Sequence, residues 1–254
     1  MNHREKHNIT NRIERDRFLS IAFLEHDEDD RLGIALNKSM GYETPVNDDE
    51  TIELLRRAVA GDQDSLRALF SMHRDRLKMM VHLRLSRRLQ GRVDDSDILQ
   101  ESFIAISNRL ADYAKEPQTP LFVWMRRMTE LKLAEIQRRH LGTQMRDADR
   151  EVTLHRGGLP MADSVSLAAQ FLGTFTSPSL AAIRIETRML VQDALNGMDP
   201  IDREVLALKH FEQLSTAEIA SVLGLSKAGA GSRYLRAIKR LKEILTNIPG
   251  FEAF

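Results

Sequence analysis

The sequence predicts an all-α protein made of two small helical domains joined by a flexible linker. Leu, Arg, Ala and Glu are common, whereas Gly, Pro and aromatic residues are sparse, which is the composition of helices rather than sheets. Apolar residues recur at helical spacing in two long stretches, and a segment punctuated by Gly and Pro separates them. The expected organisation is an acidic extension over 1–48, helical domains over 49–150 and 179–254, and a linker over 151–178.

Charge and cysteine content exclude several classes of protein. The 254 residues include 37 basic and 37 acidic side chains, so only local patches can favour nucleic acid. Cysteine is absent, which excludes disulfides and thiolate metal sites and fits a reducing, cytoplasmic compartment. No apolar run approaches the roughly 20 residues that span a bilayer. The polar stretch from Met1 to Ser20 lacks the pattern of a secretory signal, so we expect no membrane insertion.

The N-terminal extension carries an acidic run between Glu25 and Asp30 and ends in a break at Pro45. One interpretation is a poorly ordered, solvated tail. The other is a regulatory arm whose negative charge competes with DNA for a basic surface of the protein.

Four helices are expected in the first domain. The first covers 51–60 and ends at Gly61, the second runs from Ser65 to Gly91, and the third and fourth cover 96–113 and 121–140. The third helix has its apolar residues in one stripe, at Leu99, Phe103, Ile106 and Leu110. The polar face of the second helix is strongly basic and carries Arg67, Arg74, Arg76, Lys78, Arg84, Arg87 and Arg88.

The second domain is expected to end in a helix-turn-helix over 214–245. A helix over 179–196 precedes it, and Asp199 followed by Pro200 is typical of the start of another helix. Ser215 and Glu218 have the spacing of a capping box. Gly224 suits a left-handed turn, and Ser226 would cap the final helix.

This final helix is basic and has the pattern of a recognition helix. Its first residues would meet base edges in a major groove, and the flanking cations would contact phosphates. An alternative is a helical hairpin with a solvated basic face. Gly229 and Gly231 either let the backbone approach DNA or simply weaken the free helix. The candidate DNA-binding residues here are Ser226, Lys227, Ser232, Arg233 and Arg236.

Three motifs in order resemble the sigma-70 family of RNA polymerase sigma factors. Asp94-x-x-Asp97-x-x-Gln100-Glu101-x-Phe103 resembles the family's core-binding helix, and Trp124-Met125-x-x-Met128, ending in Arg138-Arg139, resembles the helix that engages the −10 promoter element. Residues 202–206, followed by the helix-turn-helix, resemble the domain for the −35 element. Because 151–178 is too short for a middle domain, the chain looks like the extracytoplasmic-function (ECF) subfamily.

The resemblance implies partners and site residues. Core RNA polymerase would bind through its beta-prime clamp helices and beta flap, promoter DNA would bind both domains, and the linker would thread toward the RNA exit path. Leu131 and Glu135 depart from the Asn and Asp that the family often has near its promoter-melting surface. The implied core-binding residues are Asp94, Asp97, Gln100 and Glu101, and the residues for the −10 element are Arg126, Arg127, Lys132, Arg138, Arg139 and His140.

Nothing in the sequence predicts a catalytic centre, a metal site or a cofactor. His140, His155 and His210 lack metal-ligand spacing with carboxylates, and no phosphate-binding loop appears. For Trp124, packing in the core is favoured over stacking on an unpaired base, because it shares a helical face with Met125.

We therefore expect a sigma factor that is not an enzyme, and an anti-sigma protein is a candidate further partner. One alternative is a helix-turn-helix regulator that acts without core polymerase, which would have no use for the 94–103 motif. Another is a helical nuclease, against which the lack of clustered carboxylates argues.

Overall fold

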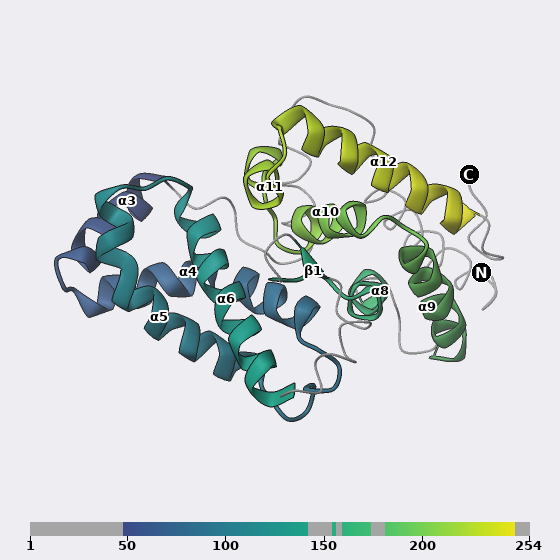
Figure 1. Cartoon of the computed structure of the whole chain (residues 1–254), viewed down its shortest axis with the longest axis horizontal. Coiled ribbons are helices and arrows are strands. Elements are labelled where there is room, and N and C mark those ends of the chain that lie inside the picture. The colour runs from purple at the N-terminus through teal and green to yellow at the C-terminus, as the bar shows by residue number, and fades with distance from the viewer. Residues whose placement is uncertain (1–47, 142–153, 156–158, 174–180, 247–254) are drawn as a thin grey trace, which may run out of the picture.

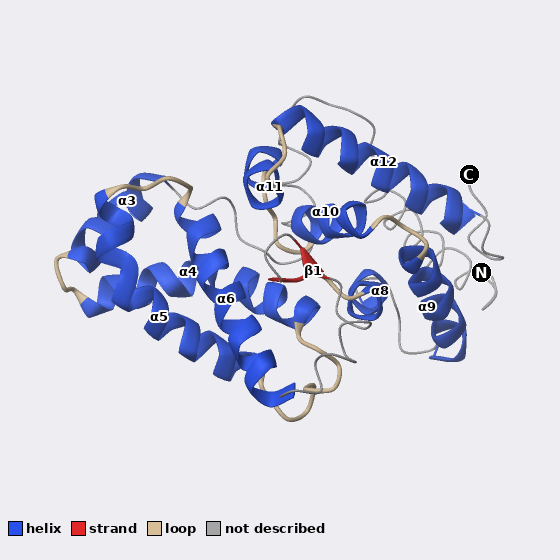
Figure 2. Ribbon diagram, in the orientation of Figure 1, coloured by secondary structure: helices blue, strands red, loops and turns tan. Residues whose placement is uncertain are grey.

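The computed structural model describes residues 48–141, 154–155, 159–173 and 181–246. Two groups of helices lie side by side (Figure 1). Most of the described chain is helical, and short loops and two strands of two residues each connect the helices (Figure 2). The prediction of an all-α fold is confirmed. In chain order the elements are α3 (Asp48–Val59), α4 (Gln63–Arg84), α5 (Asp95–Lys115), α6 (Leu121–Leu141), β1 (Leu154–His155), β2 (Leu159–Pro160), α8 (Ser164–Gly173), α9 (Ala181–Asn196), α10 (Pro200–His210), α11 (Thr216–Leu223) and α12 (Lys227–Thr246).

Helices α3 to α6 form the N-terminal domain, and aspartates begin two of them. The Asp62 carboxylate accepts hydrogen bonds from the backbone N–H groups of Asp64 and Ser65, and Asp94 accepts one from Ser96 N at 2.7 Å. Helix α4 ends at Arg84, before the end predicted at Gly91, because Leu85 turns into extended backbone. The predicted stripe of α5 is confirmed at Leu99, Ile106 and Leu110, which are buried.

Helices α9 to α12 form the C-terminal domain. Asp199 caps α10 by accepting a hydrogen bond from Ile201 N at 2.8 Å, and Pro200 occupies the first turn, as predicted. Helix α12 packs across α10 and α11, which places the helix-turn-helix at the edge of the domain (Figure 1). The core of the C-terminal domain includes Val191, Leu195, Leu206, Ala207, Phe211, Ala237 and Leu241.

The segment between the domains contains structure that the sequence did not predict. Strands β1 and β2 pair antiparallel, and α8 follows them. Leu167, Ala168 and Phe171 of α8 are buried in the core of the C-terminal domain. The backbone N–H of Asp163 donates to the carbonyl of Leu83 on α4 at 2.8 Å, so this segment contacts both domains. The linker is therefore not a featureless connection over its described part.

The two domains are in direct contact and share apolar packing. One cluster of buried residues joins Leu121 and Phe122 of α6 with Leu208 of α10, Leu214, and Ile219 of α11. Arg84 was predicted on the exposed polar face of its helix, and that prediction is wrong. Its side chain is fully buried, because it points into this contact rather than toward solvent.

Candidate nucleic-acid interface

The helix-turn-helix forms through the local contacts that the sequence predicted. Ser215 Oγ accepts a hydrogen bond from Glu218 N at 3.2 Å, and the Glu218 carboxylate accepts one from Ser215 N at 2.8 Å. Gly224 ends α11 in the left-handed region, at a φ of 64°. Ser226 Oγ then accepts from Gly229 N at 3.0 Å and begins α12. A tight turn thus sets α12 against α11.

Packing against Ser226 explains why residue 229 is a glycine. A Cβ atom added there would lie 3.1 Å from Ser226 Oγ, which is closer than ordinary van der Waals contact. The glycine therefore leaves room for the capping serine. At Gly231 an added Cβ would meet only Thr216 Cγ2, at 3.9 Å, so no comparable contact requires glycine there.

Helix α12 separates a buried apolar side from an exposed basic side. Ala230, Ala237 and Leu241 are buried. Among the predicted DNA-binding residues, Ser226, Lys227, Ser232 and Arg236 are exposed. Arg233 differs, because its guanidinium lies 2.7 Å from a carboxylate oxygen of Asp202 and 3.5 Å from one of Asp199. Contact between Arg233 and DNA would have to compete with these two acids.

The residues predicted for the −10 element divide into two groups along α6. Arg127, Arg138, Arg139 and His140 are exposed, and Lys132 is partly buried. Glu135 pairs with both Lys132 and Arg139 at 2.7 Å, which lowers the pKa of its carboxyl through the hydrogen bond from Lys132. The C-terminal half of α6 therefore presents several cations to solvent, and Glu135 partly neutralises two of them, Lys132 and Arg139.

Arg126, the remaining member of that set, is buried. Its side chain is 2% exposed and lies among carboxylates of the C-terminal domain. DNA cannot reach this guanidinium while the two domains are in contact, so a role for Arg126 at the −10 element requires them to separate.

The residues predicted to bind core polymerase gather on α5, where Asp97 and Gln100 are exposed. Asp94 is the helix cap, and its pKa is lowered by the hydrogen bond from the Ser96 backbone. Glu101 lies 3.8 Å from both Lys132 and Arg139 of α6, so the two predicted sites adjoin. An apolar groove lies beside Gln100, and Ile104 at its edge is 59% exposed.

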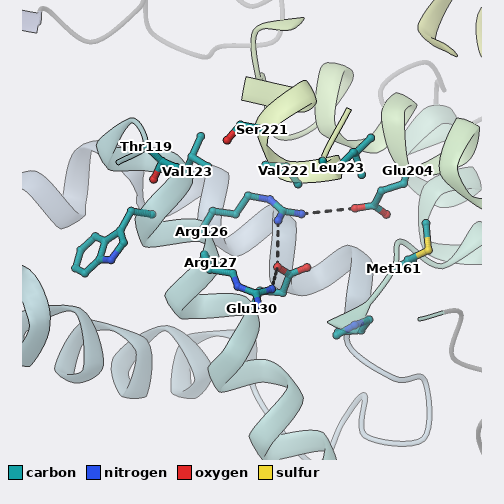
Figure 3. Close-up of a pocket in the computed structure, with 13 residues that line it drawn as sticks. Thr119, Val123, Arg126, Arg127, Glu130, Met161, Glu204, Ser221, Val222 and Leu223 are labelled. Atoms are coloured by element: carbon teal, nitrogen blue, oxygen red, sulfur yellow. Dashed lines mark hydrogen bonds and ion pairs between the residues drawn. The ribbon is translucent and has the colours of Figure 1, made fainter. Parts of the chain in front are cut away.

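Trp124 packs as the sequence favoured. Its ring stacks on Tyr113 with 4.6 Å between centroids, and the Tyr113 hydroxyl donates to the Thr119 carbonyl at 2.8 Å. It also lines a cavity between α6 and α11 (Figure 3).

Sequence reasoning missed a group of buried ions between the domains. Arg84 and Arg126 lie against Glu204 and Glu212, and all four side chains are at most 5% exposed. One signal was available, because Arg84 continues the apolar series of Leu77 and Val81 at helical spacing.

A metal centre and a membrane span are both absent from the described part of the chain. No three His, Asp or Glu side chains there lie close enough together to hold a metal ion. No described helix is long and apolar enough to cross a bilayer.

Comparison with known proteins identifies the C-terminal domain. Residues 188–241 match the family model for sigma-70, region 4. This domain is similar to sigma-70 region 4. The family model covers the end of α9, all of α10 and α11 and most of α12, so it includes the helix-turn-helix formed by α11 and α12. The resemblance to the sigma-70 family is thereby confirmed.

One curated relative matches a short stretch of the chain, and another matches most of it. The RNA polymerase sigma-E factor of Streptomyces antibioticus is 43% identical over 58 residues, which are 23% of this chain and 32% of that protein. The ECF RNA polymerase sigma factor BldN of Streptomyces coelicolor is 21% identical over 194 residues, which are 76% of this chain and 65% of that protein. The chain thus spans about a third of the length of the sigma-E factors that it matches.

A solved structure, that of CnrH in complex with the cytosolic domain of CnrY, is 24% identical. The overlap covers 78% of this chain and 97% of that one, with a TM-score of 0.47.

Proposed function

We propose that this chain is a sigma factor, which binds core RNA polymerase in the cytoplasm and directs it to promoters. The observation that carries the proposal is the pairing of two surfaces in one chain. A region 4 helix-turn-helix exposes Lys227 and Arg236, and a second helical domain exposes Asp97 and Gln100 on α5. A regulator that acts without polymerase would need only the first surface. Polymerase carries out the catalysis, so this chain acts as an adaptor and not as an enzyme.

In this proposal, region 4 reads the −35 element as a duplex. Helix α12 enters the major groove with its N-terminal turn first, so Ser226, Lys227 and Ser232 meet base edges. Arg236, one turn further along, binds a phosphate or a guanine at the rim of the groove. Arg233 reaches a base only after it exchanges Asp202 for DNA.

The N-terminal domain captures the −10 element in this proposal. Unstacking a base costs a few kcal/mol, which contacts with the extruded base and its phosphates offset. Arg138, Arg139 and His140 lie together at the end of α6 and are available for this role in the structure as it stands. Asp97 and Gln100 meet the beta-prime clamp helices, where a carboxylate and an amide serve as acceptors for a basic partner.

Reconstituted transcription tests the proposal. Purified chain added to core polymerase is expected to start run-off transcripts from a subset of genomic fragments. The double variant Asp97→Arg with Gln100→Ala is expected to lose co-purification with core polymerase while its helix content and its binding to duplex DNA remain unchanged.

The matched control is Asp112→Arg, which introduces the same charge change at an exposed position on the same helix. Equal co-purification of the Asp97/Gln100 variant and the control would contradict the assignment of the α5 face. Specific duplex binding with no transcript from any fragment would favour the regulator that acts without polymerase.

A further inference from the structure

A cavity of about 380 Å³ lies between the first half of α6 and the end of α11 (Figure 3). Besides these two helices, strand β2 with the residue that follows it and one side chain of α10 contribute to its lining. Pockets of this size hold small organic molecules in other proteins. What the cavity could hold depends on the chemistry of its walls and on the polar groups that face into it.

Much of the wall is apolar. Val123 and Trp124 contribute from α6, and Val222 and Leu223 contribute from the last turn of α11. The thioether of Met161 also lines the cavity. Water finds few hydrogen-bond partners on such surfaces and is poorly ordered there, so an apolar molecule that displaces it gains affinity. This wall therefore favours a ligand that is mostly hydrocarbon.

A buried guanidinium in the cavity wall has an unused donor. Within the described part of the chain, Arg126 Nη2 makes no hydrogen bond, and the carboxylate of Glu204 lies 3.5 Å from it. The side chain of Arg126 is only 2% exposed. Figure 3 shows its guanidinium extending from α6 across the cavity toward Glu204. A buried donor without an acceptor is unfavourable, and an oxygen atom of a bound molecule would satisfy it.

The ionised side chains of the lining balance one another. Two cations and two acids face the cavity: Arg126, Arg127, Glu130 and Glu204. Next to them, Arg84 and Glu212 form a further pair at 2.6 Å. Burial alone would lower the pKa of the Arg126 guanidinium, but Glu212 and Glu130 raise it overall, so Arg126 keeps its charge. A charge brought in by a ligand would find every opposite charge already paired, which is costly away from water. The lining therefore favours an uncharged ligand.

We propose that this cavity is a binding site for an uncharged, largely apolar molecule that carries a carbonyl oxygen. The apolar part lies against Trp124 and Val222, and the carbonyl accepts a hydrogen bond from Arg126 Nη2. A molecule in this position contacts α6 and α11 at once. The site goes beyond the proposed function and does not depend on it, because neither polymerase nor promoter DNA takes part in binding.

The fluorescent ketone prodan tests the site, because it is uncharged, carries one carbonyl on a naphthalene ring and emits at shorter wavelength in apolar surroundings. Trp124 is the only tryptophan in the chain and lines the cavity, so energy transfer from its indole reports prodan bound nearby. Titration of the full chain is expected to give saturable, one-to-one transfer, together with a blue shift of the prodan emission.

A variant that fills the cavity locates the bound probe. Val222→Phe places a larger side chain in the cavity from α11 and is expected to weaken prodan binding at least tenfold. The matched control is Val59→Phe, which makes the same enlargement at an exposed position on α3 and is expected to leave binding unchanged. If Val222→Phe loses helix content by circular dichroism, Ser221→Phe decides instead, because Ser221 is exposed at the rim of the same cavity.

Two further probes test the class of ligand. The anion 1-anilinonaphthalene-8-sulfonate has the same ring system and is expected to bind this site at least tenfold more weakly than prodan. N,N-dimethyl-2-naphthylamine resembles prodan without the ketone and is expected to bind several times more weakly, because it leaves Arg126 Nη2 without an acceptor. Both compete with prodan, so the loss of energy transfer from Trp124 measures their affinities.

The absence of saturable energy transfer would overturn the site, and so would equal prodan affinity in the unchanged chain and the folded cavity-filling variant. Equal affinity for the sulfonate would overturn the uncharged class of ligand. Equal affinity for the amine without the ketone would overturn the hydrogen bond from Arg126. Run-off transcription decides the proposed function separately, so failure of one leaves the other standing.

Discussion

Helices α6 and α12 both carry a dense series of basic residues, yet the fold treats them differently. The first half of α6 lies under the C-terminal domain, and Arg126 is buried there among carboxylates. Helix α12 rests on its apolar side and leaves Lys227 and Arg236 in solvent. The same residue type thus holds the domains together in one helix and is available to DNA in the other. Burial and the distance to an acid, not the count of cations, separate the two roles.

Removal of a buried arginine should give the largest effect. Arg84→Ala leaves Glu204 and Glu212 buried with Arg126 as their remaining guanidinium partner. We expect this change to destabilise the contact between the domains by about 3–5 kcal/mol. Urea unfolding followed by circular dichroism should show a lower midpoint or an earlier first transition. Lys115→Ala, at an exposed pair with Asp112, should change little. Equal curves for the two variants would mean that burial does not distinguish these ion pairs.

The exposed cations of α12 should matter for DNA instead. Arg236→Ala is expected to weaken binding to a −35 duplex ten- to a hundredfold, because a good base contact is worth about 1–3 kcal/mol. Arg233→Ala should cost less, since Arg233 must first leave Asp202. Fluorescence anisotropy at fixed salt, on promoter and random duplexes, measures both. An equal loss on the two duplexes would assign the residue to phosphate alone.

A buried histidine beneath α6 should make the N-terminal domain sensitive to acid. His73 packs on Phe122, and burial lowers its pKa from 6.5 to about 4. The unfolded chain therefore takes up the proton first, and the stabilisation present above pH 6.5 is lost as the pH falls toward 4. We expect the free energy of unfolding to fall by roughly 2 kcal/mol between pH 7 and pH 5. The variant His73→Phe should not show this fall.

The control for this pH dependence is His82, which is half exposed and whose pKa is shifted in the opposite direction to that of His73. A hydrogen bond with Asp95 raises the pKa of His82, so its contribution is present below pH 6.5 and is lost as the pH rises through the raised value. Asp95→Asn should leave the loss of stability in acid in place. Stability that is flat from pH 7 to 5 in the unchanged chain would contradict the role of His73.

The smallest effect is expected at the start of α11. Ser215→Ala removes the capping hydrogen bond to Glu218 N and should cost about 1 kcal/mol. Ser215→Asp keeps an acceptor and should retain most of that stability. Thermal unfolding compares the two, and an identical melting temperature for Ala and Asp would show that the cap is not needed once α12 packs on α11.

The sequence predicted what depends on neighbours along the chain. The capping box at Ser215, the cap at Asp199 and the turn at Gly224 are local, so residue type and spacing sufficed. The predicted surface residues of α5, the end of α6 and the start of α12 are exposed for the same reason, because helical spacing fixes which side faces out. Whether they bind polymerase and promoter DNA stays a prediction.

What depends on distant partners could not be predicted in this way. The partners in the pairs Arg84–Glu204 and Arg126–Glu212 are far apart in the sequence, so no periodic pattern could predict that they pair. Helix α8 was missed because residues 164–173 are almost uniformly apolar or small and show no polar face. The predicted autoinhibitory role of the acidic extension lies in residues 1–48, almost all of which are outside the described residues.

Trp124 has a consequence for experiments on intact protein. It is the only tryptophan in the chain, and it borders the cavity that α6 and α11 enclose. Indole emission shifts to the red when the ring gains water contacts. Trp124 is therefore an intrinsic fluorescent reporter. Its emission wavelength would follow the separation of the two domains in real time without any added label.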